Sequence, residues 1–128
     1  MTQSVQTPQG EIVAGLLQAI DQPARLEILQ VIGRGEACVC HLEAALGQRQ
    51  AYISQHLMAL RDAGIITSRR AGRYVFYRLN DVRVLDLIML AGSLAGAAPT
   101  APRPLPDCPC PHCSNAGGIS LEIEIPNR

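Results

Sequence analysis

A chain of 128 residues can form one domain with its own apolar core and one extension. It contains no apolar run of about eighteen residues that could span a bilayer, and its start, MTQSVQTPQG, lacks the positive and apolar blocks of a secretory signal. We therefore expect a cytoplasmic protein that does not contact a membrane. The formal net charge is zero, which argues against a uniformly basic binder of nucleic acid.

Four helices are predicted in the first half of the chain, after a flexible N-terminus over residues 1–9. Apolar side chains share one helical face over residues 11–20. DQPARLEILQVIGRG predicts a second helix, because it has a proline in its first turn and glycines at its end. CVCHLEAALG and QRQAYISQHLMALRDAG then predict two helices joined by a tight turn at Gly47. The side chains of the later helix that we expect to face the core are Ile53, Leu57 and Leu60.

The periodicity then changes from helical to alternating. IITSRR and RYVFYRL flank a turn at Ala71 and Gly72 and predict a β-hairpin. Asn80 is in position to cap a last helix, whose body, VLDLIMLAGSLAG, is apolar almost all the way round. Such a helix needs two apolar partners, so we expect a homodimer through the first and last helices. The alternative is a last helix wrapped by its own chain.

Residues 98–128 have a different composition. PTAPRPLPDCPCPHCSNAGG contains six of the nine prolines and has no helical or strand period, which predicts an extended tail. The closing ISLEIEIPNR alternates apolar and polar residues, so residues 119–128 form either an edge strand or a frayed end.

The order of helix, turn, helix and hairpin is that of a winged helix-turn-helix. We therefore predict a mainly α fold with a β-hairpin wing (α+β) over residues 10–97. Positive charge is concentrated within it, because residues 46–80 contain six arginines and one acid. Arginine neutralises phosphate, and glutamine and serine bond to base edges; the alternative is a solvated polar face. The residues predicted to contact double-stranded DNA are Arg49, Gln50, Tyr52, Ser54, Gln55 and His56 on the outward face of the helix, and Arg69, Arg70 and Arg73 on the hairpin.

Cys38 and Cys40 form a pair at the predicted start of a helix. Positions two residues apart lie about 200° apart on a regular helix, so the two side chains cannot both face one core. At a helix start, where the backbone is not yet regular, both sulfurs can turn toward one ion, and the amide dipoles favour thiolate. Two cysteines that only fill the core are the alternative.

The tail carries three further thiols, Cys108, Cys110 and Cys113, beside His112. The prolines between them lower the entropy lost when the sulfurs converge. Three thiolates suit arsenite or Pb(II), and four suit Zn(II) or Cd(II). The five cysteines are therefore the predicted metal ligands, in one shared site or in two separate sites, within or between subunits. The alternative is a tail that only scavenges metal or is structural.

The sequence is also similar to a known family. SQHLMALRDAGIITSRRAGRYVFYRL closely resembles the recognition helix and wing of ArsR/SmtB transcriptional repressors, and CVCHL resembles the metal-binding motif of the family's arsenic and cadmium/lead sensors. The resemblance covers about residues 10–95. It implies a dimeric repressor that occupies an inverted-repeat operator and leaves when its inducer binds.

Two departures from the family limit what the resemblance implies. Glu43 and Ala44 follow Leu42 where the arsenic sensors often have a third cysteine, so any third thiol comes from the tail. The last helix contains no histidine, whereas the family's zinc sensors use aspartate and histidine there.

We therefore expect a repressor, not an enzyme, that releases DNA when arsenite, Cd(II), Pb(II) or Zn(II) binds its thiolates, with no organic cofactor. One alternative keeps the fold and makes disulfide or persulfide formation the signal. A small thiol enzyme or metal-transfer protein is a further alternative, but no Ser/His/Asp or Cys/His/Asp motif supports it.

Overall fold

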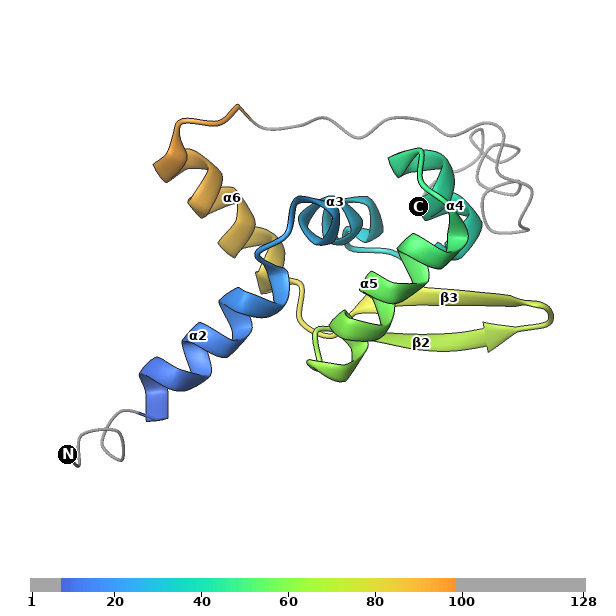
Figure 1. Cartoon of the computed structure of the whole chain (residues 1–128), viewed down its shortest axis with the longest axis horizontal. Coiled ribbons are helices and arrows are strands. Elements are labelled where there is room, and N and C mark those ends of the chain that lie inside the picture. The colour runs from blue at the N-terminus through green and yellow to red at the C-terminus, as the bar shows by residue number, and fades with distance from the viewer. Residues whose placement is uncertain (1–7, 99–128) are drawn as a thin grey trace, which may run out of the picture.

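The computed structural model describes residues 8–98 as one chain of helices with a small antiparallel sheet (Figure 1). Residues 1–7 and 99–128 lie outside the described part, and with them Cys108, Cys110, Cys113 and the alternating segment 119–128. The predicted mainly α class with a β-hairpin wing is confirmed. The elements are α2 (Pro8–Ile20), α3 (Pro23–Ile32), β1 (Ala37–Cys38), α4 (Val39–Leu46), α5 (Gln50–Asp62), β2 (Ile66–Ala71), β3 (Tyr74–Leu79) and α6 (Arg83–Ala95).

The core lies between α3, α4, α5 and one face of the sheet. The prediction that Ile53, Leu57 and Leu60 point inward is confirmed, because each is at most 1% exposed. The helical period of α5 therefore fixes which of its faces remains available to a ligand. The largest fully buried aliphatic side chains are Ile28, Leu29, Leu42, Ile53, Leu57, Leu60 and Ile66.

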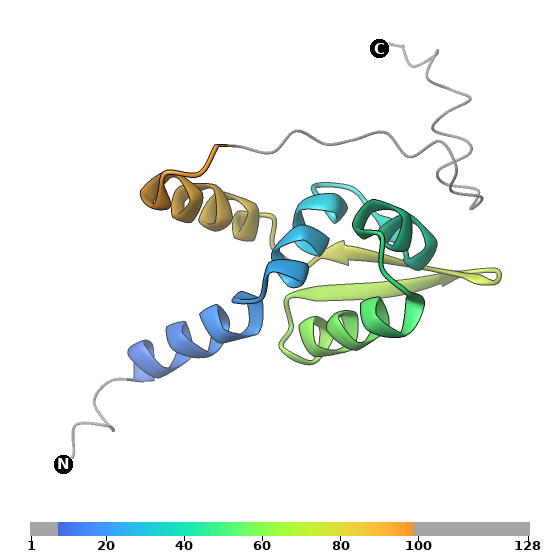
Figure 2. The same cartoon turned by 45° about the horizontal axis from the view of Figure 1, so that its top comes forward.

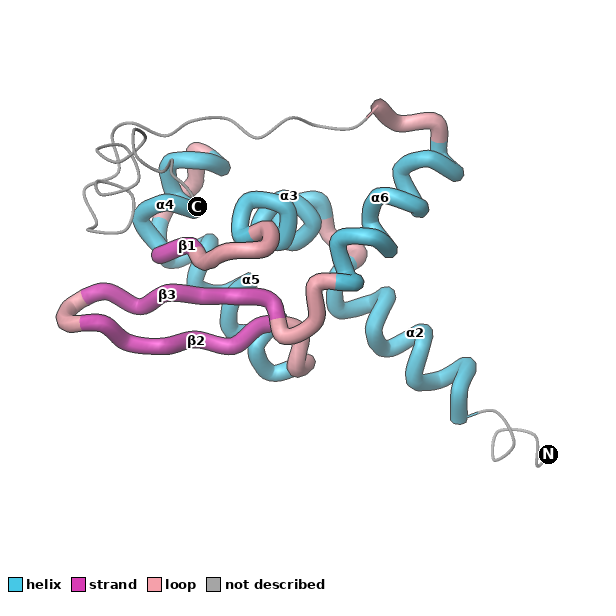
Figure 3. The backbone as a smooth tube through the Cα atoms, turned by 180° about the vertical axis from the view of Figure 1, so that it is seen from behind, coloured by secondary structure: helices cyan, strands magenta, loops and turns pink. Residues whose placement is uncertain are grey.

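The sheet contains a strand that the sequence did not predict. Ala37 and Cys38 form β1, which pairs with β3 on the side away from β2, so the strand order is β1-β3-β2 (Figure 3). Cys38 has an extended backbone (φ −91°, ψ 168°) and lies directly before α4. The irregular helix start expected around the cysteines is thus the end of a paired strand.

The two faces of the sheet have different neighbours. Directly opposed residues of antiparallel strands place their side chains on the same face, and successive residues alternate. Ala37 and Tyr77 are opposed and belong to the main core, whereas Cys38 and Phe76 are opposed and form a second, smaller cluster. We call the face with Ala37 the core face and the face with Cys38 the outer face.

α2 and α6 lie at the end of the molecule opposite the hairpin tip (Figures 1 and 2). α2 begins at Pro8, so residues 8 and 9, which we expected to be flexible, are helical. α6 begins only at Arg83, and the prediction that Asn80 caps it is wrong. The Asn80 side chain instead donates to the carbonyl oxygen of Gly64 (2.6 Å), and an oxygen of Asp81 accepts the Arg83 N–H (2.9 Å).

The turn between α4 and α5 depends on Gly47. Its backbone is left-handed (φ 66°, ψ 32°), and its N–H donates to the carbonyl of Glu43 (2.8 Å) to close α4. A residue with a Cβ is strained in this conformation. This turn sets the angle at which α5 leaves α4.

We predict that Gly47→Ala lowers the free energy of unfolding by about 1 kcal/mol. The added Cβ would meet no atom within 4 Å, so the loss comes from the backbone alone. Gly35→Ala is the matched control, because that site is equally open and does not have the left-handed φ. Urea unfolding of both variants measures their free energies of unfolding. Equal stabilities would contradict the role of the left-handed backbone at Gly47.

Candidate DNA interface and thiol site

The outer side of α5 carries most of the residues predicted to read DNA. A shallow groove runs along it, lined by Gln48, Arg49, Ala51, Tyr52, Ser54, Gln55 and Met58. Gln50 is exposed at the first turn of the helix, directly after the N-cap residue Arg49. The structure thus brings Arg49, Gln50, Tyr52, Ser54 and Gln55 to one surface. Their role in DNA binding stays a prediction.

The prediction that His56 faces outward is wrong. Its side chain lies beside Ile53, Leu57 and Leu60 on the inward half of α5, and the residue is 8% exposed. Arg25 of α3 donates from Nε to the imidazole Nδ1 (3.0 Å) and from Nη1 to the carbonyl of Ala19 (3.0 Å). Burial, helped by the positive charge of Arg25, lowers the pKa of His56 below 6.5. His56 therefore fastens α5 to α3 as a neutral acceptor.

The three arginines predicted to bind DNA from the wing have different surroundings. Arg70 is opposed to Val75 and is exposed on the core face, the side of the sheet that carries α5. Arg73 lies in the turn, with its guanidinium 5.9 Å from the centre of the Tyr74 ring. Both are placed to extend the positive surface of α5 toward the hairpin tip.

Arg69 is on the outer face and is paired with an acid. Its Nε and Nη2 atoms donate to the two carboxylate oxygens of Glu36, both at 2.7 Å. These hydrogen bonds raise the pKa of Arg69 above its ordinary value. Its guanidinium also stacks over Phe76, 4.9 Å from the ring centre. The charge of Arg69 is therefore paired with an acid of the protein itself, unlike the charges of Arg70 and Arg73.

Cys38 and Cys40 converge on the same outer face. Their sulfur atoms lie 2.8 Å apart, with Cys38 2% exposed and Cys40 half-buried. Cys38 and Phe76 form a small buried cluster, and the partly buried Cys40, Ala71 and Tyr74 pack against it. We call Cys38 and Cys40 the thiol pair. Both sulfurs can thus reach one ion, while ion binding itself stays a prediction.

Among residues 8–98, no group of three or more His, Cys, Asp or Glu side chains is arranged to hold a metal. The thiol pair offers two sulfurs at the start of α4, one on the N-cap residue Cys38 and one in the first turn at Cys40.

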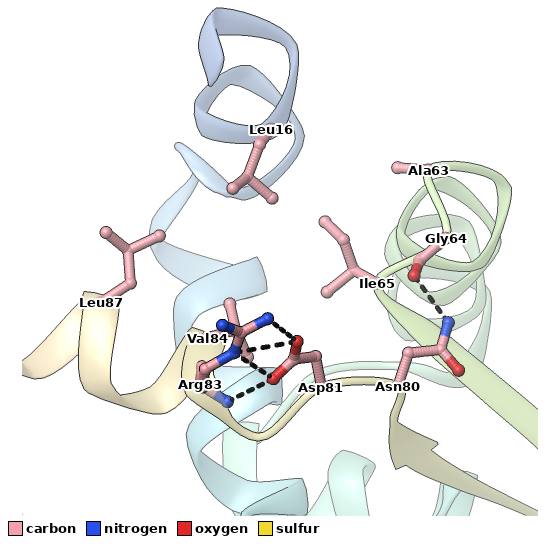
Figure 4. A pocket seen from close by; sticks show the side chains of 9 residues that line it. All are labelled: Leu16, Ala63, Gly64, Ile65, Asn80, Asp81, Arg83, Val84 and Leu87. Carbon is pink, nitrogen blue, oxygen red and sulfur yellow. Dashed lines mark hydrogen bonds and ion pairs between the residues drawn. The ribbon is translucent and has the colours of Figure 1, made fainter. Parts of the chain in front are cut away.

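A hollow of about 410 Å³ opens between α2, the turn after α5 and the start of α6 (Figure 4). Leu16, Ile65 and Leu87 line it, beside an ion pair in which Arg83 donates to Asp81 (2.7 Å) and lowers the pKa of Asp81 to about 2. The neighbouring helices expose large apolar side chains. Those on α2 and α6 are Ile12, Val13, Leu16, Leu17, Met89, Leu90 and Leu94. No helix within residues 8–98 is long and apolar enough to cross a membrane.

Comparison with known proteins identifies the family. The model of the family described as "Bacterial regulatory protein, arsR family" matches residues 22–68. The chain is 37% identical over 94 residues to a probable mercury resistance operon repressor of Streptomyces lividans, covering 73% of this chain and 75% of that protein. The chain belongs to the arsR family. It is also 43% identical over 76 residues to a biofilm growth-associated repressor of Agrobacterium fabrum, covering 59% of this chain and 65% of that protein.

Several solved structures share the fold. NolR from Sinorhizobium fredii matches with a TM-score of 0.66 and 30% identity, over 77% of this chain and 97% of NolR. A homodimeric winged helix-turn-helix DNA-binding domain from Mycobacterium bovis matches with a TM-score of 0.62 and 27% identity, over 75% of this chain and 87% of that domain. The chain is thus a transcription regulator of the winged helix-turn-helix type.

Several site residues of this arsR-family chain were not predicted from its sequence. Ala51 and Met58 line the α5 groove, and their exposure on the helical wheel opposite Ile53 and Leu60 was a signal that could have identified them. Arg25 and Glu36 lie 31 and 33 residues from their partners, and no local pattern indicates such pairs.

We predict that His56 makes the stability of the protein depend on pH. Because its folded pKa is lowered, the unfolded state binds more protons just below pH 6.5, so the free energy of unfolding falls as the pH decreases through this window. His56→Gln should lose this slope, and His41→Gln, the control, should keep it. Denaturant unfolding between about pH 7.5 and about pH 5.5 measures the slopes; a slope retained in His56→Gln would contradict the role of this imidazole.

Proposed function

We propose that the chain is a homodimeric repressor that binds an inverted-repeat operator in double-stranded DNA and releases it when a thiophilic ion binds the thiol pair. The observation that carries this proposal is the approach of the Cys38 and Cys40 sulfurs to 2.8 Å at the start of the helix-turn-helix. A site in this position is connected to both of the proposed DNA-reading elements. α4 connects it to α5, and the pairing of β1 with β3 connects it to the wing.

In this proposal α5 enters the major groove of the DNA. The side chains that line the shallow groove along α5 then face the base edges. Gln55 and Ser54 hydrogen-bond bases or phosphates, and Ala51 and Met58 offer apolar contact to thymine methyl groups. Arg49, Arg70 and Arg73 supply positive charge for the phosphates on either side. His56 is excluded from this surface because it is buried.

The dimer forms through α2 and α6. These two helices expose more large apolar side chains than a monomeric domain of this size usually exposes, and no residue of α6 is buried within the chain. The homodimeric state of the Mycobacterium bovis domain supports a homodimer here. A twofold dimer then matches the two halves of an inverted-repeat operator.

The inducer is a soft ion such as arsenite, Cd(II), Pb(II) or Zn(II), because such ions prefer thiolate ligands. The thiol pair supplies two of them. The tail cysteines either supply the remaining ligands of the same ion or form a separate site of their own. The likeness to a repressor named for mercury resistance supports a thiophilic inducer. Ion binding that favours the DNA-free shape weakens operator binding, and DNA weakens ion binding by the same factor.

A second candidate signal is oxidation of the same pair. Two sulfurs 2.8 Å apart are close enough to be joined by an oxidant, with loss of two electrons and two protons. A repressor of this kind would release DNA on adding an oxidant or polysulfide and would ignore metal under reducing conditions.

We predict that Arg70→Ala and Arg73→Ala each weaken operator binding on any DNA sequence and lower the salt slope of log K by about one, because each removes one phosphate contact. Fluorescence anisotropy at several salt concentrations gives the slope. Arg34→Ala removes one charge from the loop before β1, outside both candidate DNA surfaces, and is the control. An unchanged slope in both wing variants would overturn the wing assignment.

We predict that Cys38→Ser/Cys40→Ser abolishes release of the operator by Cd(II), Pb(II), Zn(II) or arsenite under strict reduction, while DNA binding without ion is kept. The triple variant Cys108→Ser/Cys110→Ser/Cys113→Ser separates the two arrangements of the tail. Loss of response in the triple variant indicates one shared site, and a kept response indicates that the thiol pair acts without the tail. Release that persists in Cys38→Ser/Cys40→Ser would contradict the proposal, as would a wild-type protein that responds only to an oxidant.

A further inference from the structure

Three side chains on the outer face form one row across all three strands. Cys38 is opposed to Phe76, and Phe76 is opposed to Arg69. Phe76 is 4% exposed and Cys38 2% exposed, so they are in close contact and protected from water. Arg69 completes the row with its guanidinium stacked over the Phe76 ring. The thiol pair therefore has a continuous packed connection to β2.

Glu36 closes this row from the other end. It lies directly before β1, and its bidentate pair with Arg69 joins the segment that leads into Cys38 to the strand farthest from β1 in the sheet. A bidentate pair fixes the orientation of both side chains more tightly than a single hydrogen bond does. The side chain of Glu36 is 17% exposed and that of Arg69 is 52% exposed, so the pair lies at the surface with its acid partly covered.

Binding of an ion changes the dimensions of the thiol pair. An ion bound by both thiolates replaces the direct contact between the two sulfurs with two bonds from sulfur to the ion, each about 2.3 Å long. The position of each sulfur is then set by the ion. Because Cys38 is packed against Phe76, a shift of Cys38 is passed on to Phe76, since close-packed interiors transmit strain.

We propose that Glu36 and Arg69 form a latch that couples the thiol pair to the wing, and that Arg69 is a positioning residue rather than a ligand of DNA. This inference rests on the proposed function of the thiol pair. The ion displaces Cys38 and Phe76, the latch carries the displacement to β2, and the wing moves Arg70 and Arg73 away from their phosphates. Glu36 and Phe76 act through Arg69 and do not touch DNA.

The test measures two quantities on the full-length chain by operator anisotropy under strict reduction. One is the salt slope without ion, and the other is the coupling factor, defined as the operator Kd with saturating Cd(II) divided by the Kd without it. A thiolate absorbance titration with Cd(II) checks that each variant still binds the ion. The variants are Glu36→Gln, Arg69→Gln and Arg69→Lys, with Arg70→Gln as the matched control.

The latch requires that Glu36→Gln and Arg69→Gln lower the coupling factor at least about fivefold, from the range of about 5 to 150 typical of allosteric coupling, while they still bind Cd(II). Arg69→Lys keeps the charge but loses the bidentate geometry, so it should lose coupling too. Arg70→Gln should do the reverse, lowering the salt slope by about one and keeping the coupling factor.

Two results overturn the latch in distinguishable ways. If Cd(II) releases the wild type and all three latch variants equally well, the latch is wrong and the proposed function stands. The same conclusion follows if Arg69→Gln lowers the salt slope as Arg70→Gln does and Arg69→Lys restores it. If the wild type binds Cd(II) and stays on its operator, the proposed function is wrong and the latch is wrong with it.

Discussion

The pairing of two residues, Ala37 and Cys38, with the middle of β3 determines where the two thiols of the described chain lie. Since side chains alternate along a strand, this register sends Ala37 into the main core and Cys38 to the outer face. A shift by one residue would exchange them, turning the thiol of Cys38 toward the main core and away from Cys40. The position of the thiol pair is thus fixed by the hairpin.

The same alternation gives adjacent arginines different environments. Arg70 extends on the side of α5, where a DNA duplex read by that helix would lie, and Arg69 extends on the side of the thiols. Arginine suits both positions for different reasons. At Arg70 a permanent charge is suited to a phosphate, and at Arg69 the flat fork matches the Glu36 carboxylate while its face stacks on Phe76. A count of the arginines alone therefore does not distinguish the two environments.

Regular periodicity made most of the fold predictable, and the exceptions have a common cause. The helical period placed Ile53, Leu57 and Leu60 correctly, and the alternating period placed the hairpin. His56 was misplaced because imidazole suits either face, and its buried position depends on Arg25, 31 residues away. β1 has two residues and leaves no periodic signal, although it is the reason that the two sulfurs converge. The Glu36–Arg69 pair likewise depends on tertiary contacts that the local sequence does not encode.

Two structural routes lead from the thiol pair toward DNA, and they differ in stiffness. One runs through α4 and its turn into α5, where Leu42, Ile53 and Leu57 are fully buried in one core, so these helices move as a unit or not at all. The other runs across the outer face, where the cluster of Cys38 and Phe76 is small and half-buried neighbours surround it. Regions with few buried apolar contacts open at lower free energy than core elements. A displacement at the sulfurs would therefore be taken up more easily by the wing than by α5. Under the proposed function, the wing is the element that an inducer at the thiol pair is best placed to move.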